Sequence, residues 1–164
     1  MLKVLELNAI EPHEFTRLLA PLFEHSPWVA ARTAGKRPFA NAAELYAALC
    51  DTVTKASAEE KLSLIRAHPD LIGREILTPE SQAEQASAGL GNISSEERER
   101  FREYNAHYRE KFGFPFVICA RLNKKEAILD AFPIRLQNSR EKEMETALAE
   151  IFKIAELRLN DLLK

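Results

Sequence analysis

Apolar residues recur at helical spacing along most of the chain. Residues 12–23 place an apolar side chain at every third or fourth position, and Pro21 must end or kink this helix. Residues 42–56 follow Asn41, a good N-cap, and carry a second apolar stripe. The pattern therefore predicts helices on both sides of residue 40.

A Ser-x-x-Glu capping box at Ser57 and Glu60 begins the next predicted helix, residues 58–67. The candidates for its buried face are Leu62, Leu64 and Ile65. Proline keeps the preceding residue out of the α region, so Pro69 ends this helix. The residue held in place is His68.

Thr78 and Pro79 begin another helix, as N-cap and first helical residue, and Gly89 and Gly91 close it. A capping box at Ser94 and Glu97 opens a long charged helix that Gly113 ends. The next segment, residues 114–122, is compatible with either strand or helix, and Pro115 makes its start extended. Two further helices are predicted at about 124–136 and 139–162.

These patterns predict an all-α fold, a multi-helix bundle with an irregular central segment that forms a single domain over residues 1–164. Apolar residues make up 46% and charged residues 29% of the 164, as in ordinary globular proteins. The net charge of -2 comes with no basic stripe, so nucleic acid is not expected as a partner. The longest apolar run, residues 112–120, is too short to span a membrane, and the absence of a secretory signal predicts a cytoplasmic protein.

The sequence contains no motif typical of a metal site or a nucleotide cofactor site. The four histidines and two cysteines form no His-x-His, His-x-x-x-His or Cys-x-x-Cys motif, and no glycine-rich phosphate loop is present. We therefore expect no metal and no nucleotide cofactor. Cys50 and Cys119 lie in apolar segments and are expected to be buried thiols.

His68 is the first candidate for chemistry, because an imidazole on a fixed main chain can exchange protons near neutral pH. It can equally be a helix C-cap, which is the more common role for an isolated His-Pro. Ser81, Glu84 and Gln85 share one face of the following helix, at positions i, i+3 and i+4. This face can bind a small polar molecule or simply face solvent.

Two other segments leave similar alternatives. Residues 111–120, "KFGFPFVICA", lead the chain inward, where main-chain groups need partners and a ligand with amide edges is one possibility. Their aromatic side chains are also typical of plain core packing. Arg158 adjoins an apolar stripe and can be either a surface residue or an inward anion clamp.

Taken together, five blocks resemble the 2-oxo-4-hydroxy-4-carboxy-5-ureidoimidazoline (OHCU) decarboxylase family. They are "FEHSPWVAARTAGKRPF" (23–39), "LIRAHPDLIGR" (64–74), "LTPESQAEQASAGL" (77–90), "KFGFPFVICA" (111–120) and "RLQNSREKEMETALAEIFKIAELRL" (135–159). The resemblance covers almost the whole chain in the family's order. It implies a homodimeric, all-helical enzyme of urate degradation that converts OHCU to (S)-allantoin and carbon dioxide without a cofactor.

The resemblance also implies site residues. His68 matches the catalytic histidine and Glu84 the essential carboxylate. The residues implied to bind substrate are Pro69, Ser81, Gln82, Gln85, Phe116, Val117, Ile118, Cys119, Ala120 and Arg158. For the arginine, Arg135 and Arg140 are the alternatives.

Two other functions fit the residue pattern. A non-catalytic helical binding domain would use the same polar face without a proton donor. A hydrolase of a cyclic amide would want a metal, or a nucleophile beside a base, and neither is evident in the sequence.

Overall fold

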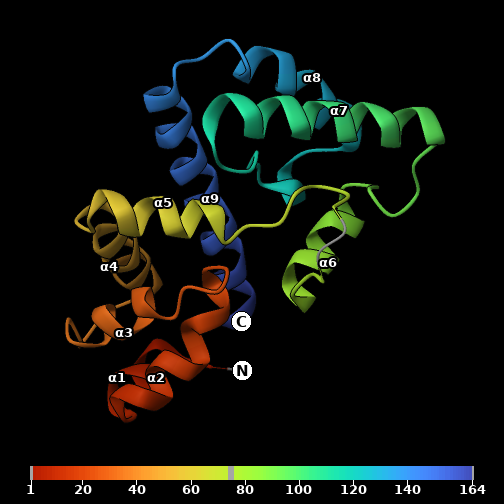
Figure 1. Ribbon diagram of the computed structural model, residues 1–164. Coiled ribbons are helices and arrows are strands. Elements are labelled where there is room, and N and C mark those ends of the chain that lie inside the picture. The colour runs from red at the N-terminus through yellow and green to blue at the C-terminus, as the bar shows by residue number, and fades with distance from the viewer. Residues whose placement is uncertain (1, 74–75, 164) are drawn as a thin grey trace. The chain divides into compact units, whose positions relative to one another are not determined.

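A computed structural model of the protein describes residues 2–73 and 76–163, and these residues form helices and loops with no β-strand (Figure 1). The predicted all-α class is confirmed. The chain divides into two compact units, residues 1–67 with 152–164 (unit 1) and residues 68–151 (unit 2). Each unit is described by itself, and the single domain over 1–164 stays a prediction.

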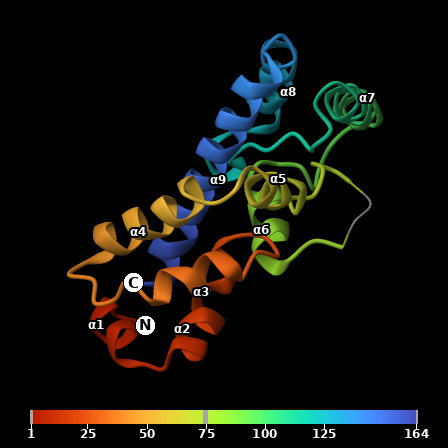
Figure 2. The same cartoon turned by 60° about the vertical axis from the view of Figure 1, so that its left-hand side comes forward.

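Unit 1 is built from short helices. They are α1 (Val4–Ala9), α2 (Pro12–Leu19), the 3-10 helix η1 (Ala20–Leu22), α3 (Trp28–Ala34), α4 (Ala42–Thr54), α5 (Ala58–Arg66) and the C-terminal part of α9 (Arg140–Leu162). α3 packs against both α2 and α4 (Figure 2). Between α3 and α4 the buried hydroxyls of Thr33 and Thr52 are 2.8 Å apart.

The sequence predicts much of unit 1, with exceptions. The Asn41 side chain accepts from the Glu44 N–H, and the Ser57–Glu60 capping box is present. In α5 Leu64 and Ile65 are buried, whereas Leu62 is only half-buried. α1 and α3 lie where the pattern predicts no helix, because each is shorter than the window over which helical period is recognisable.

Unit 2 contains α6 (Pro79–Ser87), α7 (Ser95–Phe112), the 3-10 helix η2 (Ala120–Leu122), α8 (Lys125–Arg135) and α9 as far as Ile151. The Ser94–Glu97 capping box begins α7 as predicted. Gly113 ends α7 in the left-handed region, at a φ of 79°, which favours glycine. The main chain can therefore turn sharply out of this long helix (Figure 1).

The segment after Gly113 is neither strand nor regular helix as far as Cys119, and it crosses the core of unit 2. Phe116 stacks on Phe132 of α8 with ring centroids 3.8 Å apart, and it meets Tyr108 of α7 edge-on at 5.3 Å. The aromatic side chains are therefore core packing, which was one of the two alternatives for this segment. Its main-chain groups still require partners of their own.

Candidate active site

His68 is buried, with 7% of its surface exposed, and it follows Ala67, the C-cap residue of α5. The chain just after Pro69 is held by α7. Arg109 Nε donates to the Asp70 carboxylate at 2.9 Å, and Asn105 Nδ2 donates to the Leu71 carbonyl at 2.9 Å. The main chain that carries His68 is therefore fixed on its C-terminal side.

Ile72 connects the same segment to α6. Its N–H donates to Oε1 of Gln85 at 3.3 Å. Ile72 has a φ of 57°, which is unfavourable for a β-branched residue. Such strain persists only where surrounding contacts impose it, and it is most often found near functional sites. The block at residues 64–74 ends at Arg74, which lies outside the described residues.

α6 presents two polar residues, Ser81 and Glu84, to the interior. Thr78 caps the helix by accepting from the Ser81 N–H, with Pro79 at the first helical position, as predicted. Ser81 is 6% and Glu84 9% exposed, and Gln85 is half-buried, so the face that they share is not a solvated one. Gln82 is exposed, because it lies about 100° around the helix from Ser81.

The third predicted block lies against α6. Phe116, Val117, Ile118, Cys119 and Ala120 are all at most 9% exposed, and η2 packs on α6. Burial raises the pKa of the Cys119 thiol, and the nearby carboxylates of Glu150 and Glu84 raise it further. Glu84 is thus within electrostatic reach of Cys119. The structure brings α6, residues 70–72 and residues 116–120 into one unit.

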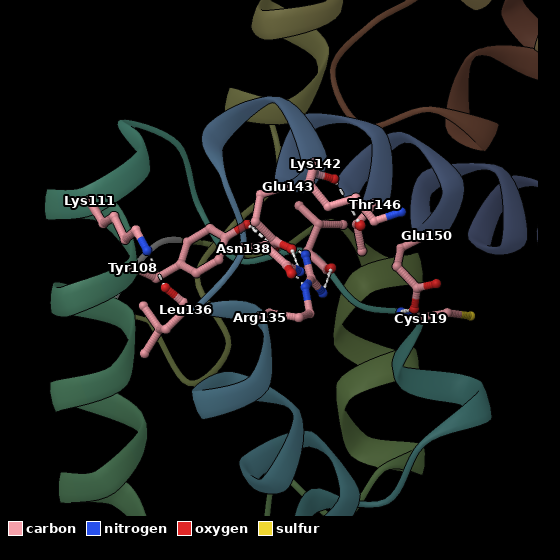
Figure 3. A network of polar contacts seen from close by, with 11 residues as sticks. Tyr108, Lys111, Cys119, Arg135, Leu136, Asn138, Lys142, Glu143, Thr146 and Glu150 are labelled. Atoms are coloured by element: carbon pink, nitrogen blue, oxygen red, sulfur yellow. Dashed lines mark hydrogen bonds and ion pairs between the residues drawn. The ribbon is translucent and has the colours of Figure 1, made fainter.

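A buried polar network, shown in Figure 3, supports this block. Arg135 donates through Nε to Glu143 at 2.8 Å and through Nη1 to the Val117 carbonyl at 2.6 Å. Glu143 also accepts from the Tyr108 hydroxyl, and the Cys119 N–H donates to Glu150 Oε1 at 3.1 Å.

Sequence reasoning missed this network. The available signal is that Glu143 and Glu150 are seven residues apart, in phase with buried Ala147 and Ile154 of α9. Acidic residues in an apolar stripe require buried partners.

Arg158 lies in unit 1, apart from these residues in the division of the chain. Its Nη2 donates to Glu24 Oε1 and its Nη1 to the Pro21 carbonyl, each at 2.8 Å. The two alternative arginines contact main-chain carbonyls within unit 2: Arg135 binds Val117, and Arg140 Nε binds Phe112 at 3.0 Å. All three arginines thus make structural contacts, and the substrate role of Arg158, with Arg135 and Arg140 as alternatives, stays a prediction.

Among residues 2–73 and 76–163, no group of three or more His, Cys, Asp or Glu side chains is arranged to hold a metal ion. No helix in the same ranges is long and apolar enough to cross a membrane.

Comparison with known proteins identifies the family. The model of the OHCU decarboxylase family matches residues 8–160. The chain belongs to the OHCU decarboxylases. An OHCU decarboxylase of Haloferax volcanii is 44% identical over 94% of this chain and 92% of its own length. A uric acid degradation bifunctional protein of Bacillus subtilis is 38% identical over 96% of this chain but only 32% of its own.

Two solved structures share the fold of this OHCU decarboxylase. A crystal structure of (S)-allantoin synthase superposes with a TM-score of 0.82 at 30% identity, and the match covers 99% of this chain and 54% of that one. A crystal structure of OHCU decarboxylase in the presence of (S)-allantoin gives a TM-score of 0.75 at 27% identity, covering 93% and 98%. The family and the carboxy-lyase class predicted from the sequence are confirmed.

Proposed function

We propose that this chain decarboxylates OHCU to (S)-allantoin without a cofactor, and that His68 and Glu84 control the protonation of the ring carbon. The observation that carries the proposal is the burial of His68, Ser81 and Glu84 within one unit of a chain of this family. A solvated helix face would leave Ser81 and Glu84 exposed to water.

The chemistry needs few protein groups. When the bond to the carboxylate breaks, its electron pair moves toward the neighbouring C=N bond of the ring, whose nitrogen takes up a proton. The enol that results becomes allantoin when the ureido-bearing carbon gains a proton and the hydroxyl loses one, leaving a ring carbonyl. Because the ring itself accepts the electron pair, the protein has only to orient the substrate and to control one proton.

His68 suits that second task because an imidazole can give and take a proton near neutral pH. In our proposal His68 supplies or relays the proton to one face of the ring. Glu84 positions the His68 imidazole, either directly or through the substrate hydroxyl. Protonation from one face gives a single enantiomer, whereas protonation in water gives both.

The remaining predicted residues bind the substrate in this proposal. Ser81 and Gln85 offer a hydroxyl and an amide beside Glu84, Gln82 follows Ser81 in the chain, and Pro69 follows His68. The main chain of residues 116–120 meets the amide edges of the ring. Arg158 holds an anionic or carbonyl oxygen through its fork of donors.

We further propose, from the resemblance alone, that the protein is a cytoplasmic homodimer. Analytical ultracentrifugation tests the dimer: sedimentation at twice the 18.6 kDa chain mass is expected, and a monomer at every concentration would contradict it. Fractionation of the source cells tests the compartment.

The activity is tested by generating OHCU in situ from urate and adding the protein at once. We expect carbon dioxide release and an optical signal of (S)-allantoin, both faster than spontaneous decay. A racemic product that forms at the spontaneous rate would refute the proposal. Ring opening without carbon dioxide release would favour a hydrolase instead, and binding without turnover a non-catalytic domain.

A further inference from the structure

Two charged side chains hold the peptide groups on either side of Ile118. Arg135 of α8 donates through Nη1 to the carbonyl oxygen of Val117 at 2.6 Å. Glu150 of α9 accepts from the N–H of Cys119 at 3.1 Å. Figure 3 shows Glu143 and Glu150 extending from the same side of α9, with Arg135 beside Glu143 and Cys119 beside Glu150.

Peptide geometry gives these two contacts a consequence for Ile118. In a trans peptide the C=O and the N–H point in opposite directions. Because Arg135 holds the Val117 carbonyl, the Ile118 N–H points away from Arg135. Because Glu150 holds the Cys119 N–H, the Ile118 carbonyl points away from Glu150. Within residues 2–73 and 76–163, neither of these two Ile118 groups forms a hydrogen bond.

The support behind Ile118 is rigid and buried. Arg135 also donates to Glu143, which is fully buried, and its guanidinium lies over the Phe116 ring at 4.1 Å. Asn138 Nδ2 donates to the second oxygen of Glu143 at 2.8 Å. Apolar residues can often replace a buried ion pair with no loss of stability. Because Arg135 and Glu150 each bind a main-chain group of residues 117–119, we expect their main role to be the direction of the main chain.

We infer that Glu150 is a positioning residue for the decarboxylation and that, with Arg135, it aims the N–H and C=O of Ile118 at the substrate. A neighbouring donor and acceptor match the N–H and C=O edge of a cyclic amide or ureido group. This inference rests on the proposed function. In it Glu150 touches no substrate atom and acts through the Cys119 peptide group.

The test compares Glu150→Ala, which removes the acceptor, with Glu150→Gln, which keeps an oxygen acceptor without the charge. Loss of orientation costs about 10- to 100-fold in rate. We expect Glu150→Ala to lower kcat by that factor with a smaller rise in KM, and to lower the enantiomeric excess of allantoin. Glu150→Gln should restore most of both. The matched control is Glu145→Ala, on the exposed side of the same helix, which should match wild type.

Nuclear magnetic resonance gives a second readout. In wild type the Ile118 amide signal should shift on titration with (S)-allantoin, and in Glu150→Ala the Cys119 amide proton should move upfield. Wild-type kinetics in a folded Glu150→Ala variant would overturn the inference, as would equal losses in the Ala and Gln variants. Absence of activity in wild type would instead refute the proposed function.

Discussion

The hydroxyl of Tyr108 donates a hydrogen bond to Oε1 of Glu143 across 2.5 Å in the interior of unit 2, and the same oxygen accepts from Nε of Arg135 at 2.8 Å. One carboxylate oxygen thus joins α7, α8 and α9. Neither Tyr108 nor Glu143 is exposed at all. The junction thus links three helices that contact residues 113–119.

Removal of one partner of the buried Arg135–Glu143 ion pair should lower the free energy of unfolding. Arg135→Met leaves the Glu143 charge buried without its cation, which typically costs roughly 3–5 kcal/mol. Urea unfolding followed by circular dichroism measures the loss. The matched control is Arg102→Met, whose partner Glu99 is exposed, where a loss of about 1 kcal/mol or less is expected. Equal losses in the two variants would contradict the role of the network.

Tyr108 should make stability fall at high pH. Burial raises the pKa of its hydroxyl, and the hydrogen bond to Glu143 raises it further, so the folded protein holds this proton more tightly than the unfolded chain does. Its contribution is complete below about pH 10 and is lost as the pH rises, at up to about 1.4 kcal/mol per pH unit.

Urea unfolding from pH 8 to 11 tests this expectation with Tyr108→Phe. The variant should be less stable at pH 8 but lose stability less steeply above pH 10. Some slope should remain, since burial also raises the pKa of Tyr46. Parallel curves for variant and wild type would show that Tyr108 has no such linkage.

The thiols of Cys50 and Cys119 should react slowly with alkylating reagents in the native protein. Burial raises the pKa of Cys50 and of Cys119, and the thiolate is the reactive form. At pH 8 we expect slow alkylation by iodoacetamide, slowest at buried Cys119 and faster at half-buried Cys50. In urea both should react at the rate of a free cysteine. Rapid alkylation of Cys119 in the folded protein would contradict the burial of residues 116–120.

Arg158 and Arg140 offer a test of the predicted anion clamp. Arg158→Lys keeps the charge but loses the forked pair of donors. If Arg158 binds substrate, its KM should rise by about tenfold or more, since hydrogen bonds to charged groups contribute roughly 1.5–3 kcal/mol. Arg140→Lys changes the contacts of the guanidinium to the Phe112 carbonyl, to Met144 Sδ and to the Phe114 ring, and should leave KM unchanged. Equal KM values in both variants and wild type would remove Arg158 from the site.

Local signals in the sequence account for most of the fold. Asn41, Ser57, Thr78 and Ser94 each cap the helix that they are predicted to begin, because a cap depends only on residues three or four positions away. The buried face of α5 was harder to predict. Leu62 and Leu64 are two positions apart and so lie on opposite faces of the helix. Only tertiary packing determines that Leu64 is the buried one.

The sequence likewise predicts one part of the candidate site and not the other. Ser81, Glu84 and Gln85 share a face because of helix geometry, which the sequence reveals. Pairing of Arg135 with Glu143 and Val117, or of Glu150 with Cys119, depends on how distant elements pack, and single-sequence patterns do not contain that information. The resemblance names the residues expected at the substrate. It does not name the residues behind them.

The most direct test of the central claim is the yield and handedness of allantoin from freshly generated OHCU with His68→Asn. Loss of a general acid or base typically costs about 10²- to 10⁴-fold, so we predict a folded variant that gives racemic product near the spontaneous rate. His107→Asn, at an exposed histidine of α7, is the matched control and should behave as wild type. Undiminished formation of (S)-allantoin by His68→Asn would contradict the account.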